Sequence, residues 1–237
     1  MAPISPWFST HYGPNIPYPK NFVFQSNALW STRWAEILAL GPRFVEIITW
    51  NDFGESSYVG PLASSHNDDG SSKWVDGMPH GGWLDMAKLY IRAYKAGRTE
   101  IEVKEGEEKL IYWHRPTPKG VTCSDDTLGK PNGWELLTDE VFVVALLKTP
   151  GTVSVTSGGV VKEFQAPAGA SLHTMGMGVG KQTFKLGRNG TEVFGAVSGR
   201  DVVDRCVCGV YNFNAYVGTV PGGAPDGLVD KGAMGAC

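Results

Sequence analysis

Long apolar runs and positive charge are both scarce in this 237-residue sequence. No segment approaches the roughly 18 consecutive apolar residues of a membrane-spanning helix, so a membrane partner is excluded. The net charge is -3 and no basic stretch stands out, which excludes a nucleic acid bound through its phosphates. The first residues show no basic start followed by an apolar run, so they do not form a signal peptide.

Cysteine is also sparse, with Cys123, Cys206, Cys208 and Cys237 as its four positions. On a strand, Cys206 and Cys208 would share a face, so each is expected to pair with a distant cysteine. A zinc site is the alternative, although C-x-C without a neighbouring His is a poor ligand spacing. Asn189 begins an N-glycosylation acceptor pattern. Together with the missing signal, these marks predict a secreted parent protein whose beginning is absent.

Residues 1–97 have the pattern of an α/β fold. A helix is predicted from an N-cap at Ser26 to about Ala39, ended by Gly41 and the proline after it. The apolar run 44–50 predicts a buried parallel strand. After a long loop, a second helix ends near Gly97, and this order is typical of a βα-barrel or a doubly wound sheet. The predicted buried faces are Trp30, Trp34, Ile37 and Leu38 on the first helix, and Leu84, Ala87, Ile91 and Tyr94 on the second.

Residues 98–219 change to short β-type runs separated by turn residues, which favours a β-sandwich. Residues 220–237 are rich in Gly, Pro and Asp and predict a flexible tail. The expected strands are 110–113, 141–147, 152–156, 182–186, 191–194 and 207–216.

The motif WNDFGES at residues 50–56 directly follows the predicted parallel strand. In such folds the reactive groups lie at the carboxyl ends of strands, which places Asp52 and Glu55 there, with Gly54 allowing a sharp turn between them. Two carboxylates at one site match the acid and base of glycoside hydrolysis. An Asx turn, with Asp52 bonded to nearby backbone and Glu55 solvated, is the alternative interpretation.

Aromatic and histidine side chains surround both predicted loops. Flat rings beside polar donors suit sugars, so these side chains are candidates for substrate binding. The alternative is that several rings belong to the core and that the histidines are structural. The histidines have no partner at metal-ligand spacing, so no metal site is expected. The candidates are Trp7, His11, Tyr12, Trp50, Tyr58, His80 and Trp83.

A series of strings in order carries a family resemblance: PWFSTHYG, KNFVF, LWSTRW, FVEIITWNDFGES, YVGPL, MPHGGWLDM and IYWHRPTPK, then VFVVALL, FQAPAGA, MGVG and CGVYNFNAYVGT. The chain thereby resembles glycoside hydrolase family 71, the fungal α-1,3-glucanases also called mutanases, nearly throughout its length up to Thr219. The resemblance implies endo-hydrolysis of cell-wall α-1,3-glucan with inversion and without a cofactor. It carries Asp52 and Glu55 over as the acid/base pair, roles unassigned, and implies a (β/α)8 barrel followed by a β-sandwich.

Two positions depart from the family pattern, and both put the affinity for a sugar in doubt. Ser57 stands where the family usually has His, and Gly81 stands where an Asp commonly follows the His of the later motif.

The length limits what this chain can build. A (β/α)8 barrel needs about 250 residues, whereas residues 1–97 hold only its last two βα units. We therefore expect an incomplete active site here. Two other hypotheses stay open: a β-sandwich that binds glucan through Tyr112, Trp113 or Trp134 without hydrolysis, and a fragment with no function of its own. The oligomeric state is left open.

Overall fold

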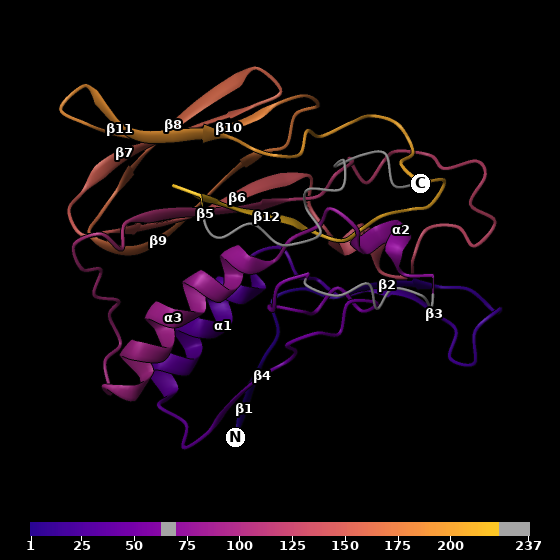
Figure 1. Cartoon of the computed structure of the whole chain (residues 1–237), viewed down its shortest axis with the longest axis horizontal. Coiled ribbons are helices and arrows are strands. Elements are labelled where there is room, and N and C mark those ends of the chain that lie inside the picture. Colours follow the sequence, from indigo (N-terminus) through magenta and orange to yellow (C-terminus); the bar gives the residue numbers. More distant parts are fainter. Residues whose placement is uncertain (63–69, 223–237) are drawn as a thin grey trace.

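The computed structural model describes residues 1–62 and 70–222, and its N-terminal part is an α/β arrangement (Figure 1). Strand β1 (Ala2–Ile4) pairs in parallel with β4 (Val45–Ile47). Between them lie an antiparallel hairpin of β2 (Ser9–Tyr12) and β3 (Lys20–Val23), and then helix α1 (Leu29–Leu40). Each parallel strand is therefore followed by a loop and later by a helix, as a βα unit requires.

Helix α1 ends as predicted but begins later than predicted. Gly41 adopts a left-handed conformation (φ 57°), and its N–H donates to the carbonyl of Ile37. The predicted N-cap at Ser26 is wrong, because the helix starts three residues further on. The buried Ser26 hydroxyl instead accepts the N–H of Phe8 (3.1 Å) and donates to the carbonyl of Phe24 (3.1 Å). Ser26 thus ties together the two ends of the β2–β3 hairpin.

Two helices follow β4: the short α2 (Ser72–Val75) and the long α3 (Gly81–Lys95). Helix α3 ends near Gly97 as predicted, with Gly97 at φ 64° and the next N–H bonded back to Ala93. No helix among the described residues is long and apolar enough to cross a membrane. The buried face of α3 is displaced from the predicted one. Among the four predicted positions, Ala87 is fully buried and the other three are only partly buried. The observed buried face consists of Gly82, Trp83, Met86, Ala87, Leu89, Tyr90 and Ala93.

The later residues form two four-stranded antiparallel sheets, one above the other in Figure 1. The sheet beside the helices contains β5 (Lys109–His114), β6 (Glu140–Leu147), β9 (Gly169–Gly176) and β12 (Tyr216–Val220), in the order β12-β5-β6-β9. The other contains β7 (Gly151–Ser157), β8 (Val160–Ala166), β10 (Gln182–Arg188) and β11 (Thr191–Val197), in the order β11-β10-β7-β8. A 3-10 turn, η1 (Trp134–Leu136), precedes β6.

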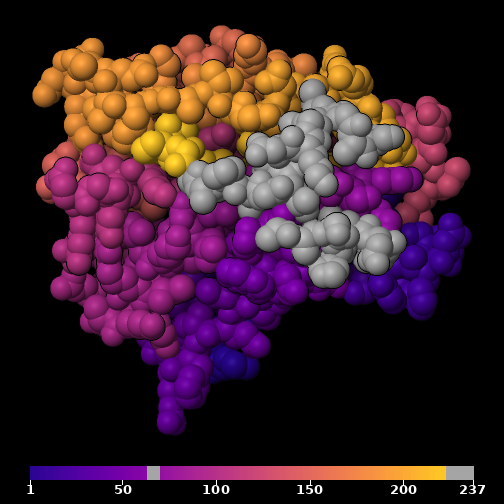
Figure 2. Space-filling view, in the orientation of Figure 1, coloured from indigo at the N-terminus to yellow at the C-terminus, as the bar shows by residue number. Residues whose placement is uncertain are grey.

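The sheet beside the helices is buried on both faces, which explains the continuous apolar run of β6. On one face Trp113 and Phe142 share a core cluster with Trp34 and Trp83 of the helices. On the other face its side chains pack against the second sheet, where Tyr112 stacks on Phe184 at a centroid distance of 3.8 Å. In the space-filling view, the magenta residues of α3 and the orange residues of the strands above form one continuous surface (Figure 2). The helices and this sheet therefore share one core.

The structure corrects the strand predictions in three respects. The run 44–50 is not a buried strand: β4 covers only Val45–Ile47, and Phe44 and Trp50 are each 58% exposed, because among the described strands only β1 lies beside it. In the run 207–216 only Tyr216 belongs to a strand, and the residues before it form an irregular connection. Strands β8 and β9 were not predicted. The predicted tail is described only as far as residue 222, and the rest lies outside the described residues.

Candidate active site

The acidic loop, residues 52–56, follows β4 and is held by its own hydrogen bonds. The N–H of Asp52 donates to the Thr49 hydroxyl (2.8 Å), and the N–H of Glu55 donates to a carboxylate oxygen of Asp52 (3.3 Å). The Asx-type contact of the alternative interpretation is therefore present. Gly54 lies within a turn closed by the hydrogen bond from the N–H of Ser56 to the carbonyl of Phe53 (2.9 Å), although Ser56 and not Gly54 takes the left-handed conformation (φ 59°). The side chains of Asp52 and Glu55 are both half-buried in this loop.

Gly54 is instead required by close packing. A Cβ at this position would lie 1.7 Å from the hydroxyl oxygen of Tyr12. The carbonyl of Gly54 also accepts a hydrogen bond from the indole N–H of Trp74 (3.2 Å). Tyr12 and Trp74 meet edge to face, with centroids 5.1 Å apart. Tyr12, a predicted sugar contact, thus supports the acidic loop, and Trp74, which carries no local signal in the sequence, does the same.

Glu55 is paired with a cation that sequence reasoning missed. The ammonium of Lys20, on β3, donates to a carboxylate oxygen of Glu55, and both side chains remain partly exposed. This hydrogen bond raises the pKa of Lys20. The hairpin also holds the loop through its backbone, since the N–H of Ser9 donates to the carbonyl of Glu55 (3.0 Å). Lys20 and the backbone of Ser9 therefore fix the position of Glu55.

Asp52 has a different electrostatic environment. Burial is the main cause that raises the pKa of its carboxyl, because the charged form loses hydration. The negative charge of Glu55 and a hydrogen bond between the two carboxyl groups raise the pKa of Asp52 further. The loop thus combines a carboxyl group that retains its proton more readily than usual with a carboxylate bound to Lys20. Two such unlike environments are what separates an acid from a base.

Four of the predicted sugar contacts are core side chains. Trp7, Tyr58, His80 and Trp83 are 2%, 0%, 0% and 0% exposed. Trp7 and Trp83 stack on each other, and the indole N–H of Trp7 donates to the carbonyl of Phe213 (2.9 Å). The rings of Tyr58 and His80 stack at 3.8 Å. The contacts of Trp7, Tyr58, His80 and Trp83 are thus with other protein groups. Trp50, by contrast, is exposed at the rim of the acidic loop.

His80 forms the centre of a buried polar network. Its ring nitrogens contact the carbonyl of Tyr58 (2.8 Å) on one side, and the side-chain oxygen of Asn214 and the carbonyl of Ala215 (both 3.0 Å) on the other. Burial outweighs these acceptors and lowers the pKa of His80 to about 4. The ring is therefore neutral near pH 7, and it connects the residues after the acidic loop to those before β12.

His11 lies beside the site, in a buried ion pair that sequence reasoning did not predict. Its two nitrogens face Asp126 (2.7 Å) and the side-chain oxygen of Asn21 (2.8 Å). The Asn21 amide donates to two loop carbonyls, which fixes its oxygen toward His11. His11 and Asp126 line a cavity of about 480 Å³ together with Tyr12, Trp74 and Lys73.

The two departures from the family pattern have different surroundings. Ser57 is 2% exposed, and its hydroxyl oxygen has no hydrogen-bond partner among residues 1–62 and 70–222. A Cβ at Gly81, the first residue of α3, would meet nothing within 4 Å. The Ser57 position is thus enclosed, whereas the Gly81 position has free space.

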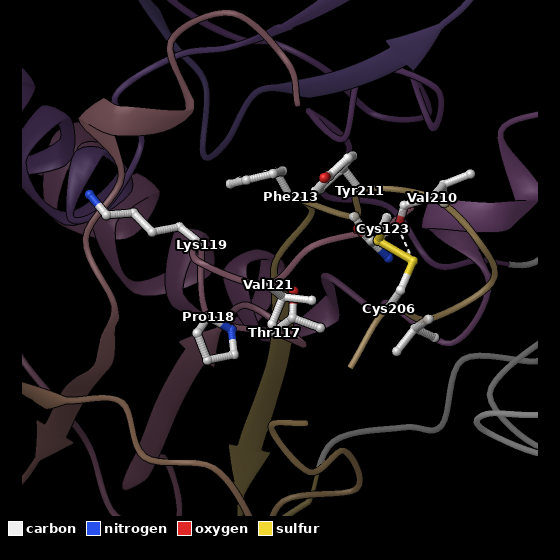
Figure 3. Close-up of a pocket in the computed structure, with 11 residues that line it drawn as sticks. Thr117, Pro118, Lys119, Val121, Cys123, Cys206, Val210, Tyr211 and Phe213 are labelled. Carbon is white, nitrogen blue, oxygen red and sulfur yellow. Dashed lines mark hydrogen bonds between the residues drawn. A yellow bond between two sulfur atoms is a disulfide. The ribbon is translucent and has the colours of Figure 1, made fainter. Parts of the chain in front are cut away.

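A disulfide joins Cys123 and Cys206, with Cα atoms 5.0 Å apart (Figure 3). The prediction that Cys206 pairs with a distant cysteine is confirmed. Cys208 is disulfide-bonded as well, and Cys237 lies outside the described residues. The cavity beside the bond measures about 10 Å³, room for at most one water molecule. Within the described chain, no cluster of three His, Cys, Asp or Glu side chains is able to hold a metal ion.

Asn189 lies at an exposed hairpin turn between β10 and β11, as expected for a glycosylation acceptor. Asn189 (φ 51°) and Gly190 (φ 75°) both adopt positive φ, the geometry that Asn-Gly hairpins favour. Its glycosylation stays a prediction.

Comparison with known proteins identifies the family. The model of Glycosyl hydrolase family 71 matches residues 1–229. A mutanase of Penicillium rubens is 47% identical over 237 residues, which is all of this chain and 51% of that protein. The glucan endo-1,3-alpha-glucosidase agn1 of Schizosaccharomyces pombe is 37% identical over 221 residues, 93% of this chain and 50% of that protein. The ascus wall endo-1,3-alpha-glucanase of the same yeast is 32% identical over 166 residues, 68% of this chain and 37% of that protein.

The chain spans about half the length of the first two of these relatives. No solved structure matches it. The family match covers most of the chain and includes the acidic loop and both sheets. The chain therefore belongs to glycosyl hydrolase family 71.

Proposed function

We propose that this chain is the C-terminal portion of a secreted endo-acting α-1,3-glucan hydrolase of the fungal cell wall, with Asp52 and Glu55 as its acid/base pair. The observation that carries the proposal is the acidic loop, where two neighbouring carboxyl groups have unlike electrostatic environments. The relatives, named as a mutanase and as endo-1,3-α-glucanases, support the substrate. Hydrolysis by such a pair needs no cofactor.

The environments favour one assignment of roles. Asp52, with its raised pKa, is the better proton donor to the leaving oxygen. Glu55, held by Lys20, is then the base for an attacking water. Inverting glycosidases hold their two carboxyl groups about 6.5–9.5 Å apart, so that a water fits beside the sugar. Because the carboxyl groups of Asp52 and Glu55 interact directly in this structure, the proposed roles require the two side chains to move apart when the substrate enters.

The position of this loop supports a finer description of the fold. We propose that residues 1–97 are the last two βα units of a (β/α)8 barrel, and that residues 98–219 are a β-sandwich. The β2–β3 hairpin follows the carboxyl end of β1, and the acidic loop follows the carboxyl end of the parallel strand β4. Loops at these ends build the active sites of such barrels. The exposed Phe44, just before β4, fits a barrel whose other units come from outside this chain.

Among the predicted sugar contacts, Trp50 and Tyr12 fit this role best, since Trp50 is exposed at the rim and Tyr12 lines the adjoining cavity. The disulfide and the exposed Asn189 turn support a secreted location. The non-catalytic β-sandwich module has less support. Tyr112 and Trp113 are 4% and 0% exposed, so neither presents a ring to a ligand.

The test is a chimera in which this chain replaces the matching half of the Penicillium rubens mutanase. We expect it to release reducing sugar from insoluble α-1,3-glucan, and we expect Asp52→Asn and Glu55→Gln each to lower kcat by about 100-fold or more. Asp85→Asn is the matched control, because this carboxylate binds Lys88 and Lys109 on the far side of α3. Full activity in both site variants would rule out the acid/base assignment. The 237-residue chain by itself is expected to release no sugar.

A further inference from the structure

The β2–β3 hairpin has two different faces. Its register places Thr10 opposite Phe22 and Tyr12 opposite Lys20 on one face. Ser9, His11, Asn21 and Val23 occupy the other face, where His11 binds Asn21 and Val23 enters the core. Side chains alternate along a strand, so Phe8 and Phe24, just beyond the strand ends, fall on the same face as Phe22.

Three phenylalanine rings gather on this face, and we call them the phenylalanine patch: Phe8, Phe22 and Phe24. Their centroids are 5.1 Å (Phe8–Phe22), 4.4 Å (Phe8–Phe24) and 5.6 Å (Phe22–Phe24) apart. Phe24 is 53% exposed, and the other two rings are partly exposed. Scattered single apolar side chains are ordinary on a protein surface, but a contiguous group marks a place of contact with a ligand or partner.

The patch adjoins the acidic loop. Lys20, which binds Glu55, lies two residues before Phe22 on the same face of β3, a separation of about 7 Å along the strand. Ser9, directly after Phe8, donates its N–H to the carbonyl of Glu55. Along β3, Lys20 therefore lies between the Glu55 carboxylate that it binds and the ring of Phe22.

We propose that the phenylalanine patch binds pyranose rings of the glucan chain that reaches Asp52 and Glu55. The C–H faces of a pyranose pack on flat aromatic rings, while its hydroxyls need polar groups at the edge. The patch provides the rings, and Lys20 provides a donor at its border. An apolar protein partner would use the rings but not the charged border that continues into the carboxyl pair. This inference rests on the proposed function, because it assumes that the glucan chain passes from the patch to the acidic loop.

The experiment measures retention of the purified 237-residue chain on insoluble α-1,3-glucan by sedimentation. The double variant Phe22→Ala/Phe24→Ala is expected to bind about tenfold more weakly, as the loss of ring stacking predicts. Phe44→Ala is the matched control, because Phe44 is similarly exposed (58%) but precedes β4, at the opposite end from the acidic loop. Phe24→Ala alone, with its ring already half exposed, is expected to weaken binding while leaving the melting temperature unchanged.

Each outcome decides the proposal. Equal retention of the patch variants and the unchanged chain overturns it, as does an unchanged chain that does not bind. If the patch variants keep glucan binding but dissociate a dimer seen by gel filtration, the patch is a contact between copies and the proposal is also wrong. The chimera separates the two hypotheses: Asp52→Asn and Glu55→Gln test hydrolysis there, whereas retention of the Phe22→Ala/Phe24→Ala variant on glucan tests the patch here.

Discussion

Acidification from pH 7 to pH 5 is expected to destabilise this protein through two fully buried histidines, His80 and His114. Burial lowers the pKa of each ring to about 4, from an ordinary value of 6.5, and the positive charge of Arg200 contributes at His114. The hydrogen bonds of His114 suit a neutral ring, which contacts the carbonyl of Arg115 (3.0 Å) and the hydroxyl of Ser198 (3.3 Å).

The direction of the stability change follows from the pH at which the folded and unfolded states take up a proton. In the unfolded chain both rings protonate near pH 6.5, whereas in the folded protein they stay neutral until about pH 4. The unfolded state therefore binds more protons in this window, and stability falls as the pH falls. Between pH 7 and pH 5 these two pKa values correspond to a loss of about 2 kcal/mol for each histidine, or about 4 kcal/mol together. For a chain of this size that is about 10 °C in melting temperature.

The assay is urea unfolding at pH 7, 6 and 5, with the free energy of unfolding extrapolated to water. The variant His114→Gln keeps a side-chain donor near Arg115 but cannot take up a proton. It is expected to lose about 2 kcal/mol less than the unchanged protein between pH 7 and pH 5. Parallel pH profiles for the variant and the unchanged protein would refute the reasoning, whatever the variant's stability at pH 7.

Two further predictions follow from packing and from the disulfide. Gly54→Ala would place its Cβ 1.7 Å from the Tyr12 hydroxyl oxygen, so a loss of about 1–3 kcal/mol in the free energy of unfolding by urea is expected. Gly81→Ala is the control, because the space around this position is free and stability should stay unchanged. Equal behaviour of the two variants would contradict the packing argument. Cys123→Ser/Cys206→Ser removes a crosslink that spans 83 residues and should cost about 4–5 kcal/mol. An unchanged urea midpoint would contradict that estimate.

Local sequence patterns were sufficient wherever an element's own residues determine it. The continuous apolar run identified β6, because both faces of its sheet exclude water. The alternation of apolar and polar residues identified β7 and β10, because only one face of their sheet is buried. Gly41 and Gly97 identified the helix ends through the left-handed conformation that glycine adopts freely. Strand β8 was missed because its side chains are mostly exposed and it is held by pairing with β7.

The candidate site divides in the same way. The sequence by itself determined the acidic motif, its place after β4 and its family, since these depend on neighbouring residues and on the order of motifs. Only the tertiary structure decided that Lys20 binds Glu55, that Trp74 supports the loop, and that Trp7 and Trp83 are core side chains. These contacts join positions from 20 residues apart, for Trp74 and Gly54, to 206 residues apart, for Trp7 and Phe213. No local periodicity records such a contact, because it depends on how whole elements pack around a shared core.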